Sequence, residues 1–210
     1  MIELDPATVL YITHPQVEID AAVAPPDWGL SAIGSARVAH LAQRLTILKP
    51  TGKAAVIASA ERKAVETAAP LAAALGALVS CRPNTHENDR SSTGYLLPEA
   101  FEVQADAFFA KPSQSVRGWE RAVDAQARIQ REVQAVEQDY PDSALVFCGH
   151  GAVGTLLYCA LRGVAIDRRW DQPAGGGNWF AYDRHSRQVL GHWAPIETLF
   201  AGQRAGCEKR

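Results

Sequence analysis

The 210-residue sequence has few of the features that mark membrane proteins, disulfide-rich secreted proteins or nucleic-acid-binding proteins. No segment reaches the roughly 18 consecutive apolar residues that a membrane-spanning helix needs, and no basic segment followed by a long apolar run begins the chain. The four cysteines form no Cys-x-x-Cys pair, and a formal net charge of -2 supplies no general basic field for nucleic acid. We therefore expect a soluble, cytoplasmic protein that binds neither membranes nor nucleic acid.

The chain also lacks internal repeats and low-complexity linkers that would divide it. Its 47% content of hydrophobic residues is enough to fill a sizeable core. We predict that residues 1–210 form a single domain. Cys148 and Cys159 lie within apolar patterns, which is typical of buried free thiols in a reducing compartment.

Short apolar segments alternate with segments of helical periodicity along the chain. This alternation predicts an α/β protein with parallel strands. Pro70 interrupts one helical pattern, where we expect a kink or a break. A final pair of segments suggests an edge hairpin. Ser31 is a good N-cap for the first predicted helix, and Gly76 ends the second. The predicted strands are 8–13, 54–58, 77–81 and 145–148, the predicted helices 32–48, 65–75, 101–110, 119–136 and 153–161, and the hairpin strands 179–182 and 189–193.

Histidines follow two of the predicted strands directly. His14 comes after strand 8–13, and His150 stands where strand 145–148 gives way to a helix. Ligands of open α/β sheets bind beyond the carboxyl ends of the strands, and a helix N-terminus attracts anions. Gly151 lets the backbone approach such an anion closely. The two histidines are therefore expected at one ligand-binding edge.

Charged residues follow the other predicted strands. Arg62 and Lys63 come soon after Ser59, and the polar loop 83–98 carries Glu87 and Arg90. A neutral imidazole can attack phosphorus, cations can neutralise the phosphoryl oxygens, and a carboxylic acid can protonate the leaving oxygen. If the parallel strands bring these groups together, the set suits phosphoryl transfer to or from a small phosphorylated molecule.

These residues resemble the histidine phosphatase superfamily, also called the phosphoglycerate mutase-like family, over most of the chain. The resemblance implies a three-layer α/β/α sandwich with a mostly parallel central sheet. It further implies that His14 is the phosphorylated nucleophile, His150 the second pocket histidine and Glu87 the proton donor. No cofactor or metal is implied. The matching residues are Trp28-Gly29-Leu30-Ser31, Gly34, Ser59 through Ala68, Pro70-Leu71-Ala72, Glu87 and His150-Gly151.

The sequence departs from the family at two phosphate-binding positions. The family motif Arg-His-Gly reads Thr13-His14-Pro15 here, and the second pocket arginine, four residues after the serine, is Lys63. Lysine keeps the charge but lacks the bidentate guanidinium fork. Arg62, Lys63 and Arg90 are the candidates for contacts to phosphate, together with Gly151.

The same residues allow other interpretations. His14, His86, Glu87 and His150 could bind a metal ion, but no His-x-x-x-His or His-x-His pair supports such a site. Residues 175–177, all glycine, suit a flexible turn better than a phosphate loop, and Ser59 lacks the glycine-flanked elbow of a serine hydrolase. Two functions stay open at this point. One is a phosphomonoesterase with a phosphohistidine intermediate, and the other is a degenerate member that binds a phosphorylated ligand or partner without turnover.

Overall fold

The computed structural model describes residues 3–48 and 52–200 of the chain. At its centre is a six-stranded sheet in the order β3-β2-β4-β1-β5-β6. Strands β1 to β4 are parallel to one another, and β5 and β6 pair antiparallel. The predicted mostly parallel sheet is therefore confirmed. The strands are β1 (Thr8–Thr13), β2 (Lys53–Ala58), β3 (Val79–Cys81), β4 (Ser143–Gly149), β5 (Asn178–Asp183) and β6 (Ala194–Pro195).

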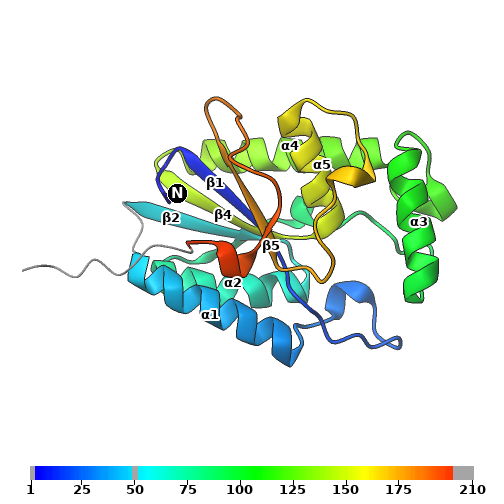
Figure 1. Ribbon diagram of the computed structural model, residues 1–210, viewed down its shortest axis with the longest axis horizontal. Helices are drawn as coiled ribbons and strands as arrows, with labels where there is room; N and C mark the ends of the chain where they lie inside the picture. Colours follow the sequence, from blue (N-terminus) through cyan, green and yellow to red (C-terminus); the bar gives the residue numbers. More distant parts are fainter. Residues whose placement is uncertain (1–2, 49–51, 201–210) are drawn as a thin grey trace, which may run out of the picture.

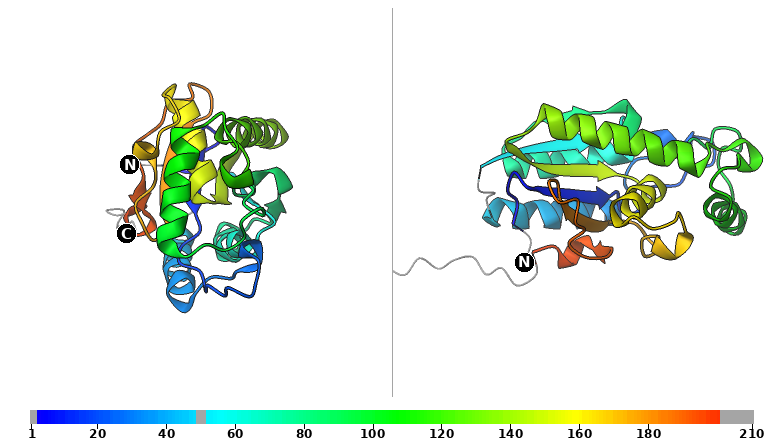
Figure 2. Two further views of the ribbon diagram at one scale, coloured as in Figure 1. Left: turned by 90° about the vertical axis from the view of Figure 1, so that its right-hand side faces the viewer. Right: turned by 90° about the horizontal axis from the view of Figure 1, so that it is seen from above.

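Helices cover both faces of this sheet, so the predicted three-layer sandwich is also confirmed (Figure 1). Alternate residues of each strand face opposite sides. In β1, Leu10 and Ile12 pack toward α1 and α2, whereas Val9 and Tyr11 pack toward α4 and α5. The helix α3 lies beyond one end of the sheet (Figure 2). The helices are α1 (Ala32–Leu48), α2 (Arg62–Leu75), α3 (Pro98–Ala110), α4 (Ala122–Asp139) and α5 (Gly151–Arg162).

Local signals set where several helices begin and end. The Ser31 side chain accepts a hydrogen bond from the Gly34 amide at 3.1 Å and so caps α1, as predicted. Gly76 ends α2 in the left-handed conformation, with φ 64°. The helix α2 continues through Pro70, so no break occurs there, since proline removes only one hydrogen bond of the helix.

Two predicted boundaries are wrong. The helix α4 begins at Ala122, and the buried Trp119 precedes it. Residues 189–193 form no strand, because Val189 makes a single bridge to Tyr182 and the strand paired with β5 is β6. Gly191, with φ 146°, lies between the bridge and β6 and interrupts the extended run.

The thiol predictions hold where the structure tests them. Cys148 and Cys159 are free and buried. Cys207 lies outside the described residues. Within the described ranges, the helices are too short or too polar to cross a membrane.

The carboxyl ends of three parallel strands meet at one edge of the sheet. β1 is followed by His14, β2 by Ser59 and β4 by His150. The parallel register pairs Thr13 with Gly149, which places the two histidines side by side. The two histidines therefore lie together at one edge of the sheet, as the sequence predicts.

Candidate active site

The His14 side chain has one ring nitrogen in a hydrogen bond, and its other ring nitrogen has no partner among residues 3–48 and 52–200. Its Nδ1 lies 2.9 Å from the carbonyl oxygen of Pro15. A carbonyl oxygen can only accept a hydrogen bond, so Nδ1 carries the proton and Nε2 keeps its lone pair. The backbone of His14 is fixed as well, because its amide donates to Gly149 and its carbonyl accepts from Gly177.

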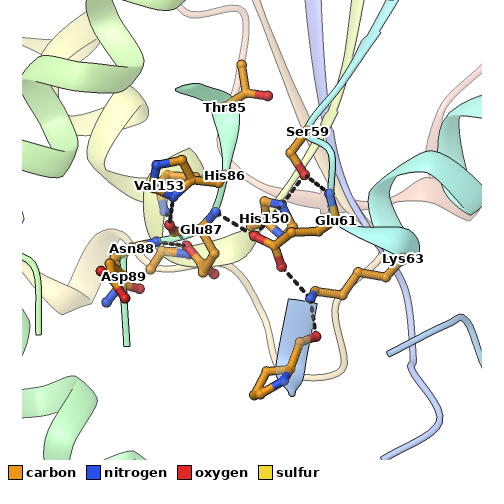
Figure 3. Close-up of polar contacts among 12 residues, drawn as sticks. Ser59, Glu61, Lys63, Thr85, His86, Glu87, Asn88, Asp89, His150 and Val153 are labelled. Carbon is orange, nitrogen blue, oxygen red and sulfur yellow. Dashed lines mark hydrogen bonds and ion pairs between the residues drawn. The ribbon is translucent and has the colours of Figure 1, made fainter. Parts of the chain in front are cut away.

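His150 lies at the N-terminus of α5 with its side chain fully buried. Its Nε2 is 2.7 Å from the Ser59 hydroxyl and 3.3 Å from a carboxylate oxygen of Glu61 (Figure 3). Its Nδ1 has no hydrogen-bond partner among the described residues. The His14 and His150 rings are 5.4 Å apart between centroids and steeply inclined to each other. The structure thus brings together the two histidines that the sequence singled out.

Glu87 reaches the same place from the loop after β3. Its carboxylate accepts hydrogen bonds from the amides of Ala152 at 3.2 Å and Val153 at 3.0 Å, in the first turn of α5. Amides and the positive end of a helix stabilise a carboxylate. Glu87 therefore caps the N-terminus of α5, next to His150.

A cavity of about 660 Å³ opens beside these groups. Its lining combines the nucleophile candidate with polar and aromatic side chains. The residues that matter for the site are His14, Glu87, Arg90, Gly151, Arg168 and Gln172.

The three candidate cations lie in different positions. Arg90 lines the cavity and stacks over Phe101 and Trp119, with its guanidinium carbon 5.1 and 5.8 Å from the ring centroids. Lys63 is near the histidines but buried, and Arg62 is 65% exposed and paired with Glu66 at 2.7 Å. Only Arg90 of the three lines the cavity of His14.

Thr13, the residue before His14, forms hydrogen bonds to two neutral neighbours. It is fully buried, and its hydroxyl donates to the Gln172 side chain at 2.6 Å and accepts from the Asn178 amide at 2.9 Å. The Thr13 hydroxyl therefore lies in a network of neutral groups.

Glu61 is a site residue that the sequence analysis missed. Its carboxylate binds Lys63 Nζ at 2.5 Å and the Glu87 amide at 2.9 Å, besides lying near His150. Lys63 Nζ also donates to the Pro25 carbonyl at 2.7 Å. The available signal was its place between Ser59 and Lys63, two residues from each.

Burial sets the protonation of the two imidazoles. Loss of hydration lowers the pKa of His14 and of His150 to about 4, so both are neutral at pH 7. Burial alone would raise the pKa of Glu61, but His150 and Lys63 beside it lower that pKa to about 2. A neutral His14 with a free Nε2 is the form that can act as a nucleophile.

These pKa values predict an acid-sensitive fold. Between pH 6.5 and about 4 the unfolded chain takes up protons on its histidines while folded His150 stays neutral, so stability falls as pH falls. For His150 the loss should reach about 1.4 kcal/mol per pH unit at most. Glu61, with its depressed pKa, loses its contribution only in the more acidic range from about 4.5 to 2. Urea unfolding at several pH values measures the slope.

The His150→Asn variant should show a shallower loss of stability over this range. His185→Asn, at an exposed histidine in the turn after β5, is the matched control and should keep the parent slope. Equal slopes in parent and His150→Asn would contradict the expectation.

Comparison with known proteins identifies the family of the chain. The model of the histidine phosphatase superfamily (branch 1) matches residues 12–193. The chain therefore belongs to the histidine phosphatase superfamily. A search of curated protein sequences gave no significant match.

Solved structures show the same fold. A mycobacterial glucosyl-3-phosphoglycerate phosphatase in complex with inorganic phosphate is 21% identical, with a TM-score of 0.70, covering 91% of this chain and 99% of the other. Bacillus stearothermophilus YhfR is 18% identical with a TM-score of 0.71, covering 87% and 93%. The alpha-ribazole phosphatase from Shigella flexneri is 17% identical with a TM-score of 0.63, also covering 87% and 93%.

The site residues do not form a metal-ligand set. Within residues 3–48 and 52–200, no three histidine, cysteine, aspartate or glutamate side chains gather as a ligand set. The predictions of no metal and no cofactor stay predictions.

Proposed function

We propose that the protein is a phosphomonoesterase that hydrolyses a small phosphorylated substrate through a phosphohistidine at His14. The observation that carries this proposal is the state of the His14 imidazole. It is neutral at pH 7, its Nδ1 is tied to the Pro15 carbonyl, and its Nε2 stays free beside the cavity. Family membership supports the same reaction class.

The reaction has two steps. Nε2 of His14 attacks phosphorus, the bond from phosphorus to the ester oxygen breaks, and the leaving oxygen takes a proton from Glu87. Water then attacks the phosphohistidine, gives its proton back to Glu87, and releases phosphate with His14 restored. Arg90, which lines the cavity of His14, would contact the phosphoryl oxygens.

The position of Glu87 bears on which substrates react fastest. Its carboxylate accepts hydrogen bonds from the amides of Ala152 and Val153 in the first turn of α5. An alkoxide leaving group needs a proton from Glu87 as it departs, whereas an aryl oxide can leave without one. We therefore expect substrates with good leaving groups, such as aryl phosphates, to react faster than alkyl phosphates.

Trapping the intermediate tests the proposal. The protein is mixed with an aryl phosphate carrying labelled phosphorus, in the presence of a metal chelator, and quenched with base. We expect a protein-bound label that is lost in acid, as a phosphoramidate is, and that is absent from His14→Asn. Turnover that requires added metal, or that proceeds without any trapped label in single-turnover experiments, would contradict the phosphohistidine mechanism.

The position of Arg90 leads to a binding prediction. Arg90→Met keeps an apolar stem against Phe101 and Trp119 but removes the charge. We expect tungstate, as a phosphate analogue, to bind about 10-fold more weakly because a charge-assisted contact is lost. Titration calorimetry measures the change, and Arg62→Met is the control because Arg62 is exposed and paired with Glu66. A larger loss in Arg62→Met than in Arg90→Met would place the anion elsewhere.

A second candidate function is binding of a phosphorylated ligand or partner without turnover. The neutral hydrogen-bond network of Thr13 and the pairing of Lys63 with Glu61 favour this candidate. Neither leaves a positive charge to stabilise a phosphoryl group during transfer. Oxyanion binding with neither trapped label nor turnover of any phosphomonoester would select this candidate.

A further inference from the structure

The Glu61 carboxylate is bound by the groups that a phosphate pocket would offer to its ligand. One oxygen meets Lys63 Nζ at 2.5 Å, and the other meets the Glu87 amide at 2.9 Å and His150 Nε2 at 3.3 Å. Figure 3 shows the carboxylate between the pocket histidine and the lysine. The side chain is only 11% exposed. An ammonium, an amide and an imidazole around one carboxylate form an occupied anion site.

Lys63 cannot serve a ligand while it holds Glu61. Its side chain is 4% exposed, and its ammonium is shared between Glu61 and the Pro25 carbonyl. A buried charge that loses its partner pays a large desolvation penalty, so the pair persists unless another anion replaces Glu61.

Glu61 also changes the net charge that an incoming ligand meets. The titratable and charged groups around it lie on the strand and helix ends and on the loop after β3. Both pocket histidines are neutral at pH 7, and Glu61 offsets the charge of Lys63, to which it is bound. The titratable and charged groups around Glu61 are His14, Lys63, His86, Glu87, Asp89, Arg90 and His150.

Two neighbouring cavities connect Glu61 with the surroundings of His14. Glu61 lines a second cavity of about 590 Å³, which shares Glu87 and Arg90 with the cavity of His14. An anion at His14 therefore lies near both Arg90 and the carboxylate of Glu61.

We propose that Glu61 is a specificity-determining residue, an internal anion that occupies the Lys63 side of the phosphate pocket and makes the site prefer singly charged over doubly charged phosphate groups. This inference rests on the phosphate site proposed above. A singly charged group needs only one compensating cation, which Arg90 can supply. A dianion needs Lys63 as well, and Glu61 competes for it.

Two tetrahedral oxyanions of similar size and different charge test the proposal at one pH. Tungstate is a dianion and perrhenate a monoanion, and both are titrated at pH 8, so the protein has the same charge in the two measurements. In the parent protein we expect calorimetry to show perrhenate binding at least as tightly as tungstate. A parent that prefers tungstate by more than 10-fold would overturn the proposal without any variant.

The variants separate charge from shape. Glu61→Gln keeps an oxygen for Lys63 and the Glu87 amide but removes the charge, so tungstate should bind about 10-fold more tightly or better, with a smaller change for perrhenate. Glu61→Asp retains the charge and should still disfavour tungstate. Glu66→Gln, the same substitution on the exposed side of α2, is the control and should bind as the parent does.

The remaining outcomes are also decisive. Tungstate binding that is unchanged or weaker in a folded Glu61→Gln would overturn the role of Glu61 while leaving the phosphatase proposal to the label experiment. If neither tungstate nor perrhenate binds to the parent protein or to any variant, the proposed role of Glu61 is wrong as well. A His14-dependent label in that case would show that the phosphatase proposal survives on its own.

Discussion

His14→Asn should abolish phosphomonoester hydrolysis, with a fall in kcat of about 10³-fold or more. The attacking lone pair belongs to Nε2, and asparagine has no equivalent atom. Its side-chain amide can still donate to the Pro15 carbonyl as Nδ1 of His14 does, so the loop conformation is kept. Steady-state turnover of an aryl phosphate with a metal chelator present measures the loss.

The control for this prediction is His185→Asn, at an exposed histidine far along the chain from the site. It should hydrolyse the substrate at the parent rate. If His14→Asn kept more than about a tenth of the parent activity while folding normally, His14 would not be the nucleophile.

Gly176→Ala should destabilise the protein by about 2–4 kcal/mol and reduce turnover. Gly176 has φ +64°, which costs an alanine about 1–2 kcal/mol. An added Cβ would also lie 2.5 Å from the carbonyl oxygen of His14, a backbone atom that must then shift. The same carbonyl accepts the hydrogen bond from Gly177, so the shift moves the nucleophile.

Gly163→Ala is a matched control because it has nearly the same backbone conformation, φ +62°, with nothing within 4 Å of the added Cβ. It should cost only about 1–2 kcal/mol and leave turnover intact. Urea denaturation gives both free energies of unfolding. Equal losses in the two variants would mean that residues 175–177 do not constrain His14.

The elements of the fold could be predicted because their signals are local. The buried strands β1 and β4 are nearly continuous apolar runs, and Ser31 and Gly76 mark helix ends through bonds to their own neighbours. The wrong boundaries lie at Trp119 and at residues 189–193, where contacts distant in sequence decide. An apolar pattern shows that a residue is buried but not in which element.

The site divides in the same way. The sequence by itself placed His14 and His150 at the ends of two strands, and parallel pairing was enough to bring them together. It could not show that Glu87 caps α5 or that Arg90 stacks on Phe101. Both side chains lie on a loop, where direction depends on packing partners.

Glu61 shows the limit most clearly. It lies two residues from Ser59 and from Lys63, yet its importance comes from His150, which is 89 residues away along the chain, and from the amide of Glu87. Sequence alone determined which chemical groups follow the strands, because strand and helix periodicity is written locally. The tertiary structure alone decided which of them are free and which neutralise each other, because hydrogen bonds and ion pairs form between groups that only folding brings within about 3 Å.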